Sequence, residues 1–432
     1  MTAFTWKDRL TRTGMGRVFR YPDFVLFSFA GWIASLGSWL QRLGIQWMTW
    51  ELTHSYAWLG AVAFIDALSV TLFLPVFGTL IDRGDRLALG RLAQMLSTLM
   101  STLLWALTVG GLLNIWLLAF MMALRGLTES FWTPVRMALP PAMVPRDALA
   151  PALGITSALF NIAQILGPAL AGPVIVGFDD VSTGVGILYL LAAVSSLYYL
   201  WALYRIRLTH AEAVSKRDGS FFADFKEGLR YAATKDGLAL FMLLMIASTG
   251  LLRAFRELLA GYADNVFHQG PQGLAFLTSA IGAGALISAL MVANLSNVIG
   301  LTRKIFMFFA LSIVLQFGFA LTPNFWVAVA CTGGMGLAMA VGGIGSQVLV
   351  QSSIHGVMRG RVMSLWALIL RGGPPIGAWL IGLASEVWDF REVMTGVTIL
   401  YCVIFLFMLP RLPYLAQRLE TLPEGEPSGA RA

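Results

Sequence analysis

The sequence predicts an all-α membrane protein with twelve transmembrane helices in two pseudo-symmetric six-helix bundles. The chain of 432 residues is 57% hydrophobic and only 12% charged, whereas a soluble domain carries about 25% charged residues. Its mean hydropathy is +0.74. Apolar runs of about 20 residues, the length that crosses a bilayer, recur along the whole chain. The longest gap between them lies near the middle and leaves six runs on each side.

Each expected span is an apolar run bounded by charged or turn-forming residues. The fifth, tenth and eleventh are long and rich in glycine. In chain order the spans lie near residues 23–50, 58–81, 88–110, 114–135, 150–176, 184–205, 238–262, 273–297, 304–322, 325–352, 362–384 and 393–410.

The spans divide the chain into five parts. Residues 1–22 carry five basic residues but no apolar core, so we expect a retained cytoplasmic tail and not a signal peptide. The six-helix bundles are residues 23–205 and 238–410. Residues 206–237 form a cytoplasmic connector, and residues 411–432 form a cytoplasmic tail that we expect to be disordered.

The connector contains an amphipathic helix. Its sequence SFFADFKEGLRYAATKD places Phe221, Phe222, Phe225 and Leu229 on one helical face. This face is suited to the inner membrane surface. A simple connector between two bundles is the alternative interpretation.

The formal charge of +7 indicates topology. With both ends cytoplasmic, the inner segments hold 24 of the 30 Lys and Arg and 13 of the 23 Asp and Glu, a net +11. The outer loops hold one basic and seven acidic residues, and the spans hold five and three. Arg91, Arg205, Lys304 and Asp23, at the cytoplasmic ends of their spans, are counted with the inner segments. This asymmetry orients the chain in the membrane and makes a nucleic-acid partner unnecessary.

Motifs for cofactors and catalysis are missing from the sequence. The four histidines form no metal-binding cluster, and the two cysteines form no paired metal motif. The nucleotide-binding pattern GxxxxGK[ST] is absent, and the glycine-rich run at 333–346 lies within an apolar span. We therefore expect no cofactor, no metal, no nucleotide and no enzymatic activity.

A faint repeat supports duplicated bundles. GPALAGPVIVG in the fifth span and GGPPIGAWLIG in the eleventh share glycine spacing. Glycines 167, 172 and 177 recur 205 residues later, at 372, 377 and 382.

A family resemblance rests on several of these segments. GTLIDRGDRLALGR, which joins the second and third spans, resembles the signature loop of the major facilitator superfamily. Asp82, Arg83 and Arg86 match that loop, while Leu87 stands where the family often has a basic residue. GPALAG resembles the antiporter motif of the superfamily. SLGSWLQRLGIQW, SFWTPVRMALPPAMVPRDALAPALG and RGRVMSLWALILRGGPPIGAWLIG extend the match to a bacterial subgroup that contains the enterobactin exporter, macrolide efflux proteins and lysophospholipid transporters.

The resemblance implies transport by alternating access, with a cytoplasmic gate at this loop. The Asp82 carboxylate would meet the positive N-terminus of the eleventh span near Arg361. The alternative is that Asp82 and Arg83 have no role in gating and are only water-exposed polar residues of a tight cytoplasmic turn. The gate residues are Gly78, Asp82, Arg83, Arg86 and Arg361.

The fifth span is suited to sealing the pathway. Gly167 and Gly172 permit close helix packing, and Pro168 removes a backbone donor and bends the helix. Ordinary helix packing is the alternative interpretation.

Charged residues inside the spans are functional candidates. Arg42 and Asp66 lie at similar depths below the outer turn that joins their spans, so they could form an ion pair between the two helices. Arg125 and Glu129 are four residues apart and could form an ion pair along one helix. The same spacing separates Arg253 and Glu257. The acidic candidates for proton coupling are Asp66, Glu129 and Glu257.

Two interpretations of the charges stay open: ion pairs that hold helices in register, or side chains that line a water-filled cavity. The net +2 in the spans favours an anionic substrate group. The cavity candidates are Trp39, Arg42, Trp47, Arg125, Trp132, Asn161, Gln164, Arg253, Arg256 and Arg371.

The sequence thus predicts a secondary transporter, expected as a monomer, that exports an amphipathic small organic molecule of siderophore-like or drug-like character against protons. The first alternative is a lysophospholipid flippase or uptake transporter. An alternative of another class is a non-transporting membrane receptor or scaffold, which the shortness of the soluble segments disfavours.

Overall fold

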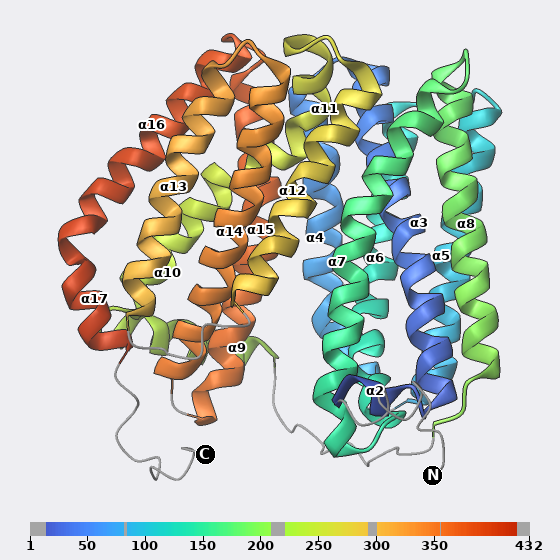
Figure 1. Cartoon of the computed structure of the whole chain (residues 1–432), viewed down its shortest axis with the longest axis horizontal. Coiled ribbons are helices and arrows are strands. Elements are labelled where there is room, and N and C mark those ends of the chain that lie inside the picture. Colours follow the sequence, from blue (N-terminus) through green and yellow to red (C-terminus); the bar gives the residue numbers. More distant parts are fainter. Residues whose placement is uncertain (1–13, 82–83, 209–220, 293–299, 355, 421–432) are drawn as a thin grey trace, which may run out of the picture. The chain divides into compact units, whose positions relative to one another are not determined.

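The structure is a computed structural model that describes residues 14–81, 84–208, 221–292, 300–354 and 356–420. Within these ranges every regular element is a helix, as predicted (Figure 1). Eleven of the described helices are long and apolar enough to cross a membrane. The predicted fourth span, α6 (Ile115–Ala138), has 24 residues but is not among the eleven, because polar residues such as Arg125 and Glu129 lower its hydropathy.

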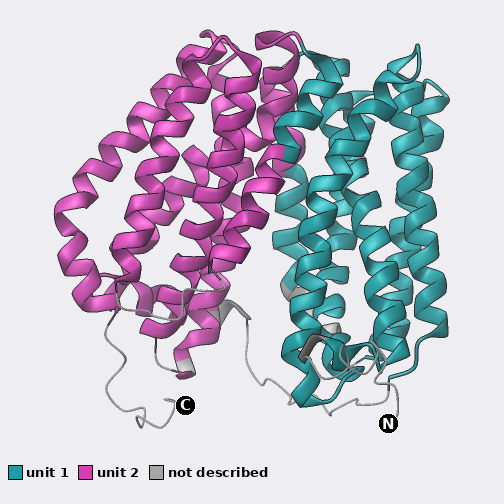
Figure 2. Cartoon of the chain, viewed as in Figure 1, with its two compact units in different colours: residues 1–54, 65–217, 269–279 teal, residues 55–64, 218–268, 280–432 magenta. Residues whose placement is uncertain are grey.

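The chain forms two compact units (Figure 2). Unit 1 comprises residues 1–54, 65–217 and 269–279. Its helices besides α6 are α2 (Gly14–Val18), α3 (Pro22–Thr53), α5 (Arg86–Val109), α7 (Arg146–Val176), α8 (Val181–Arg205) and most of α4 (Tyr56–Ile81).

Several helices of unit 1, among them α5 and α6, begin at side-chain caps. The Asp85 carboxylate accepts from the backbone N–H groups of Leu87 and Ala88 at the start of α5. Asn114 accepts from Leu117 N at 2.9 Å and begins α6. Such caps satisfy backbone donors that a helix N-terminus leaves unpaired.

Unit 2 comprises residues 55–64, 218–268 and 280–432. Its helices are α9 (Phe221–Thr234), α10 (Leu238–Ala247), α11 (Leu259–Gly261), most of α12 (Gly270–Val292), α13 (Leu301–Leu321), α14 (Phe325–Ser353), α15 (Gly356–Ala384), α16 (Phe390–Met408) and α17 (Leu412–Leu419).

Two helices belong to both units. The first nine residues of α4, Tyr56–Phe64, are part of unit 2, where the Tyr56 ring stacks on Phe390 with centroids 3.6 Å apart. The first ten residues of α12 are part of unit 1. There a Cβ added to Gly172 of α7 would lie 2.6 Å from the Cβ of Ala275. The second expected span of each half of the chain, α4 and α12, is thus divided between the two units.

The predicted span at 238–262 is less regular than a single α-helix. After α10 the chain passes through a π-helical turn (Ser248–Leu252), a 3-10 turn (Ala254–Leu258), α11 and a second π-helical turn (Tyr262–Val266). Hydropathy alone, which predicted the span, carries no information on these changes in helical pitch.

The prediction of disorder for residues 411–432 is wrong for residues 412–419. They form α17, whose Leu415 and Leu419 are buried. The Glu420 carboxylate that follows accepts from Gly300 N at 2.7 Å and Thr302 N at 2.8 Å, and so caps α13. Residues 421–432 lie outside the described residues.

The predicted amphipathic helix is α9, and it packs against α15. A Cβ added to Gly228 would lie 3.0 Å from the Arg361 carbonyl oxygen, and Ala232 is buried. Leu229, on the predicted membrane-facing side, is 54% exposed. The packed side of α9 is thus formed by small residues.

Candidate functional site

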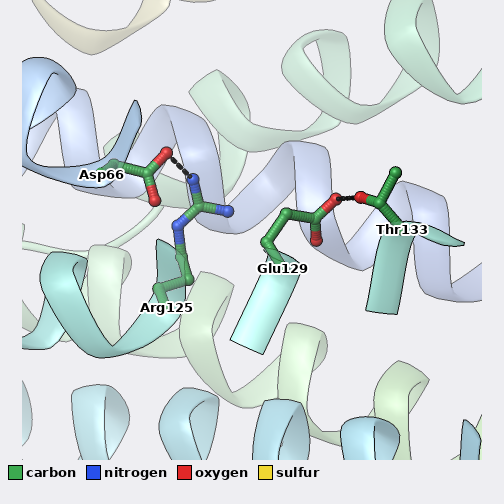
Figure 3. A network of polar contacts seen from close by, with 4 residues as sticks. All are labelled: Asp66, Arg125, Glu129 and Thr133. Carbon is green, nitrogen blue, oxygen red and sulfur yellow. Dashed lines mark hydrogen bonds and ion pairs between the residues drawn. The ribbon is translucent and has the colours of Figure 1, made fainter. Parts of the chain in front are cut away.

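An ion pair joins α4 and α6 inside unit 1. The Arg125 guanidinium donates from Nη2 to Oδ2 of Asp66 over 2.5 Å (Figure 3). The two side chains are 30% and 20% exposed. Asp66 lies ten residues into α4, roughly 15 Å along the helix from Tyr56. The pair therefore lies deep in a predicted span.

A glycine beside the arginine makes this pair possible. A Cβ added to Gly126 would lie 2.7 Å from the Cβ of Ser69 and would also overlap the Asp66 carbonyl oxygen. Without that Cβ, the backbone of α6 approaches α4 at Asp66 itself, and Arg125 is held at ion-pairing distance. Gly126 was not predicted from the sequence, where its position directly after an intramembrane arginine was the available signal.

The remaining charges of this cluster surround the pair. Thr133 Oγ1 donates to Oε1 of Glu129 over 2.9 Å, one turn along α6 (Figure 3). Arg42 and Glu129 both lie within electrostatic range of the Asp66 carboxylate. We call Arg42, Asp66, Arg125 and Glu129 the charge cluster. Its formal charge is zero when all four are ionised.

Two atoms of the pair are not used by the ion pair. Oδ1 of Asp66 and Nε of Arg125 are buried and have no hydrogen-bond partner among the described residues. Oδ1 can therefore accept a proton or a water molecule while Oδ2 faces the guanidinium.

The structure shows one pairing that spacing along the sequence did not predict. Sequence spacing allowed Arg42 to pair with Asp66 and Arg125 with Glu129; in the structure the Asp66 carboxylate accepts from Arg125, Arg42 lies within electrostatic range of Asp66, and Glu129 accepts from Thr133. Spacing along one helix cannot show which charge the neighbouring helix presents. The close approach at Gly126 decides the pairing.

In unit 2, Arg253 stands at the junction between a π-helical and a 3-10 turn. Its Nη2 donates to the Met339 carbonyl oxygen on α14 over 2.9 Å. The α-helical geometry that the predicted Arg253–Glu257 contact assumed is therefore absent. Glu257 is 8% exposed. Arg256 and Arg371 are half-buried.

The tryptophan candidates have different surroundings. Trp47 is buried in this structure, with 3% of its surface exposed. Trp132 packs edge-on against Tyr199 with centroids 5.4 Å apart, at the rim of the unit 1 core. Trp39 is half-buried and lies against Phe160.

Asn161 and Gln164 of α7 are half-buried. Gly167 and Pro168 are buried, and a Cβ added to Gly167 would overlap the Cβ of Trp39. Gly167 therefore serves the packing of α7 on α3, and Gly172 the packing of α7 on α12.

The predicted gate is only partly described. Asp82 and Arg83 lie outside the described residues, and Gly78 lies near the end of α4. Nη1 of Arg86 donates to the Ala138 carbonyl oxygen at the end of α6 over 3.4 Å. Nη1 of Arg361 pairs with Oε1 of Glu227 on α9 over 2.8 Å, a partner that was not predicted from the sequence.

These features define a class: a multi-span membrane protein with an ion pair inside its helices. The chain matches the transmembrane secretion effector family over residues 17–424 and belongs to this family of major facilitator transporters.

Curated relatives match over most of their length. The chain is 24% identical to the staphyloferrin A transporter of Staphylococcus aureus, covering 92% of this chain and 97% of that protein. It is 24% identical to macrolide efflux protein A of Streptococcus pyogenes, covering 89% and 96%. It is 26% identical to the enterobactin exporter of Escherichia coli, covering 91% and 94%.

Solved structures share the fold. A bacterial homologue of the iron transporter ferroportin superposes with a TM-score of 0.70 at 14% identity, covering 89% of this chain and 98% of that one. The nucleoside transporter NupG superposes with a TM-score of 0.69 at 15% identity, covering 90% and 98%.

Proposed function

We propose that the protein exports an amphipathic organic molecule with an anionic group, by alternating access and in exchange for protons. One observation carries this proposal: the ion pair between Asp66 and Arg125, deep in the predicted spans. Ionisable side chains are costly within a membrane and are kept there for function.

Asp66 is the proposed proton carrier. Its buried Oδ1, unpartnered within the described chain, offers a place for the proton. Protonation removes the negative charge that attracts Arg125, so the contact between α4 and α6 weakens. Release of the proton restores the ion pair. Glu129 and Glu257 are the next candidates.

The position of Asp66 favours coupling to a larger movement. Asp66 lies at the second residue of the unit 1 part of α4, and the preceding residues of the same helix belong to unit 2. A change at the Asp66–Arg125 pair therefore acts on a helix that both units share. Exchange for protons requires such a link, because alternating access is a movement of one helix bundle against the other.

The substrate class rests on charge and on the relatives. The intramembrane excess of two positive charges favours an anion over a bare cation. The names of the relatives, a staphyloferrin transporter, an enterobactin exporter and a macrolide efflux protein, support export of siderophore-like or drug-like molecules.

The remaining expectations complete the proposal. The loop from Gly78 to Arg86, together with Arg361, forms the cytoplasmic gate. The protein acts as a monomer in the bacterial inner membrane with both termini in the cytoplasm. The helix α6 also spans the membrane and brings the number of spanning helices to twelve.

The purified protein in liposomes tests this function. With an acidic lumen, an anionic catecholate amphiphile should accumulate inside, and a protonophore should abolish the accumulation. Empty liposomes control for passive movement. Absence of gradient-driven flux across anionic, neutral and zwitterionic amphiphiles would refute the proposal, and flux of lysophospholipid alone would assign the protein as a flippase.

A further inference from the structure

Two aromatic rings and two guanidinium groups form a continuous row in unit 1. The Arg42 guanidinium lies 5.8 Å from the centre of the Trp39 ring. The Trp39 ring lies 6.2 Å from that of Phe160, and the Arg136 guanidinium lies 5.7 Å from the Phe160 centre. We call these four residues the arginine–aromatic row.

Three helices build the row. Arg42 and Trp39 are on α3, Phe160 is on α7 and Arg136 is on α6. Phe160 and Gly167 are seven residues apart, so they share one face of α7. Because Gly167 has no Cβ, the Trp39 side chain lies directly against α7, beside Phe160. Gly167 is therefore a positioning residue for the row.

The row has an exposed side. Arg42 is exposed, and Phe160 is 39% exposed. Arg42 lies eleven residues before the end of α3, a depth of roughly 17 Å. A guanidinium that faced lipid at this depth would cost several kcal/mol. The exposed side of the row therefore faces water.

We propose that the arginine–aromatic row binds an aromatic ring that carries an anionic group. The ring lies against Trp39 and Phe160, since aromatic pairs prefer offset or edge contacts at such spacings. The anionic group takes a guanidinium fork, which matches a carboxylate in a bidentate way. Two cations at the ends of the row exclude a cationic aromatic. The inference rests on the proposed function, because it names the substrate class of that transporter.

Binding to the full-length protein in detergent tests the inference through ligand-induced shifts in thermal unfolding. The probes are 2,3-dihydroxybenzoate, cyclohexanecarboxylate as an anion without a flat ring, and benzyltrimethylammonium as an aromatic cation. We expect 2,3-dihydroxybenzoate to bind at least tenfold more tightly than the other two. R42Q and R136Q should each weaken its binding by tenfold or more.

Matched variants isolate the row from general effects. Arg411 lies 4.0 Å from the Phe407 ring centre in unit 2, so R411Q removes a similar contact elsewhere and should leave binding unchanged. R42K keeps the charge but loses the fork, so its affinity should be intermediate, which keeps the test valid if R42Q fails to fold. W39L combined with F160L should abolish the preference for the aromatic anion over cyclohexanecarboxylate.

The inference is overturned if the three probes bind equally, or if R42Q and R136Q bind 2,3-dihydroxybenzoate as the unaltered protein does. Proton-driven flux that is indifferent to R42Q, R136Q and the aromatic ring would also overturn it, while leaving the proposed function intact. Conversely, tight binding at the row without any proton-driven flux would sustain the binding site and refute the proposed function.

Discussion

The carboxylate of Asp66 and the guanidinium of Arg125 meet at 2.5 Å where the backbones of α4 and α6 make close contact. The contact depends on Gly126, since any larger residue would push its Cβ into the backbone of Asp66. The ion pair and the helix packing at this point are therefore one feature.

Removing one partner of this pair should be worse than removing both. R125Q leaves the partly buried Asp66 carboxylate without its cation and should destabilise the protein by about 1–3 kcal/mol, because a buried acceptor then lacks its partner. In the double variant D66N/R125Q most of this loss should be recovered. Thermal unfolding in detergent measures both. Additive losses in the double variant would show that the two side chains do not interact.

Gly126→Ala should separate α6 from α4. The added Cβ would lie 2.7 Å from that of Ser69, and such overpacking costs about 1–3 kcal/mol. Gly154→Ala is the matched control, because nothing lies within 4 Å of its added Cβ. The control should be neutral or stabilising by up to about 1 kcal/mol. Equal unfolding temperatures for the two variants would contradict the close contact.

Glu420→Ala should loosen the start of α13. Its carboxylate accepts from Gly300 N and Thr302 N, and loss of a helix cap costs about 1 kcal/mol. Glu51→Ala, at an exposed acid near the end of α3, should change stability by less than about 0.5 kcal/mol. If Glu420→Ala and Glu51→Ala have the same unfolding temperature, the Glu420 carboxylate does not stabilise α13.

Asp180, in the loop before α8, should make stability sensitive to acid. Hydrogen bonds from the Thr183 side chain and backbone hold the pKa of its carboxyl below the usual value of 3.8. A group with a lowered folded-state pKa stabilises the fold above its unfolded-state pKa, and this contribution disappears as the pH falls through the lowered value. D180N should therefore show a smaller loss of unfolding temperature below about pH 4. An unchanged acid profile in D180N would exclude the effect.

Much of the fold followed from composition and charge, since apolar runs of the right length permit only helices across a bilayer. The π-helical and 3-10 turns between Ser248 and Val266 did not follow, because hydropathy is insensitive to helical pitch. The prediction of disorder around α17 failed for a similar reason. The helix packs against α13 and α14, and Glu420 caps α13, so its order depends on segments that lie far away in the sequence.

The site was predictable residue by residue but not contact by contact. Asp66, Arg125 and Glu129 stand out as charges in apolar runs, and this signal was sufficient to select them. Their pairing depends on which helices approach closely. A glycine such as Gly126 indicates a close approach, but the sequence does not show which helix lies against it. Trp47 is buried, which the sequence did not show, because a buried tryptophan and a cavity-lining one have the same sequence signature.

Proton movement driven by a substrate gradient tests the central claim most directly. Proteoliposomes that contain a pH-sensitive dye receive the transported anion from outside, with no imposed pH gradient. Exchange for protons should make the lumen more alkaline as the anion enters, and D66N should abolish this change while still inserting and folding. An acidified lumen, or an alkaline shift of equal size in D66N, would contradict proton exchange through Asp66.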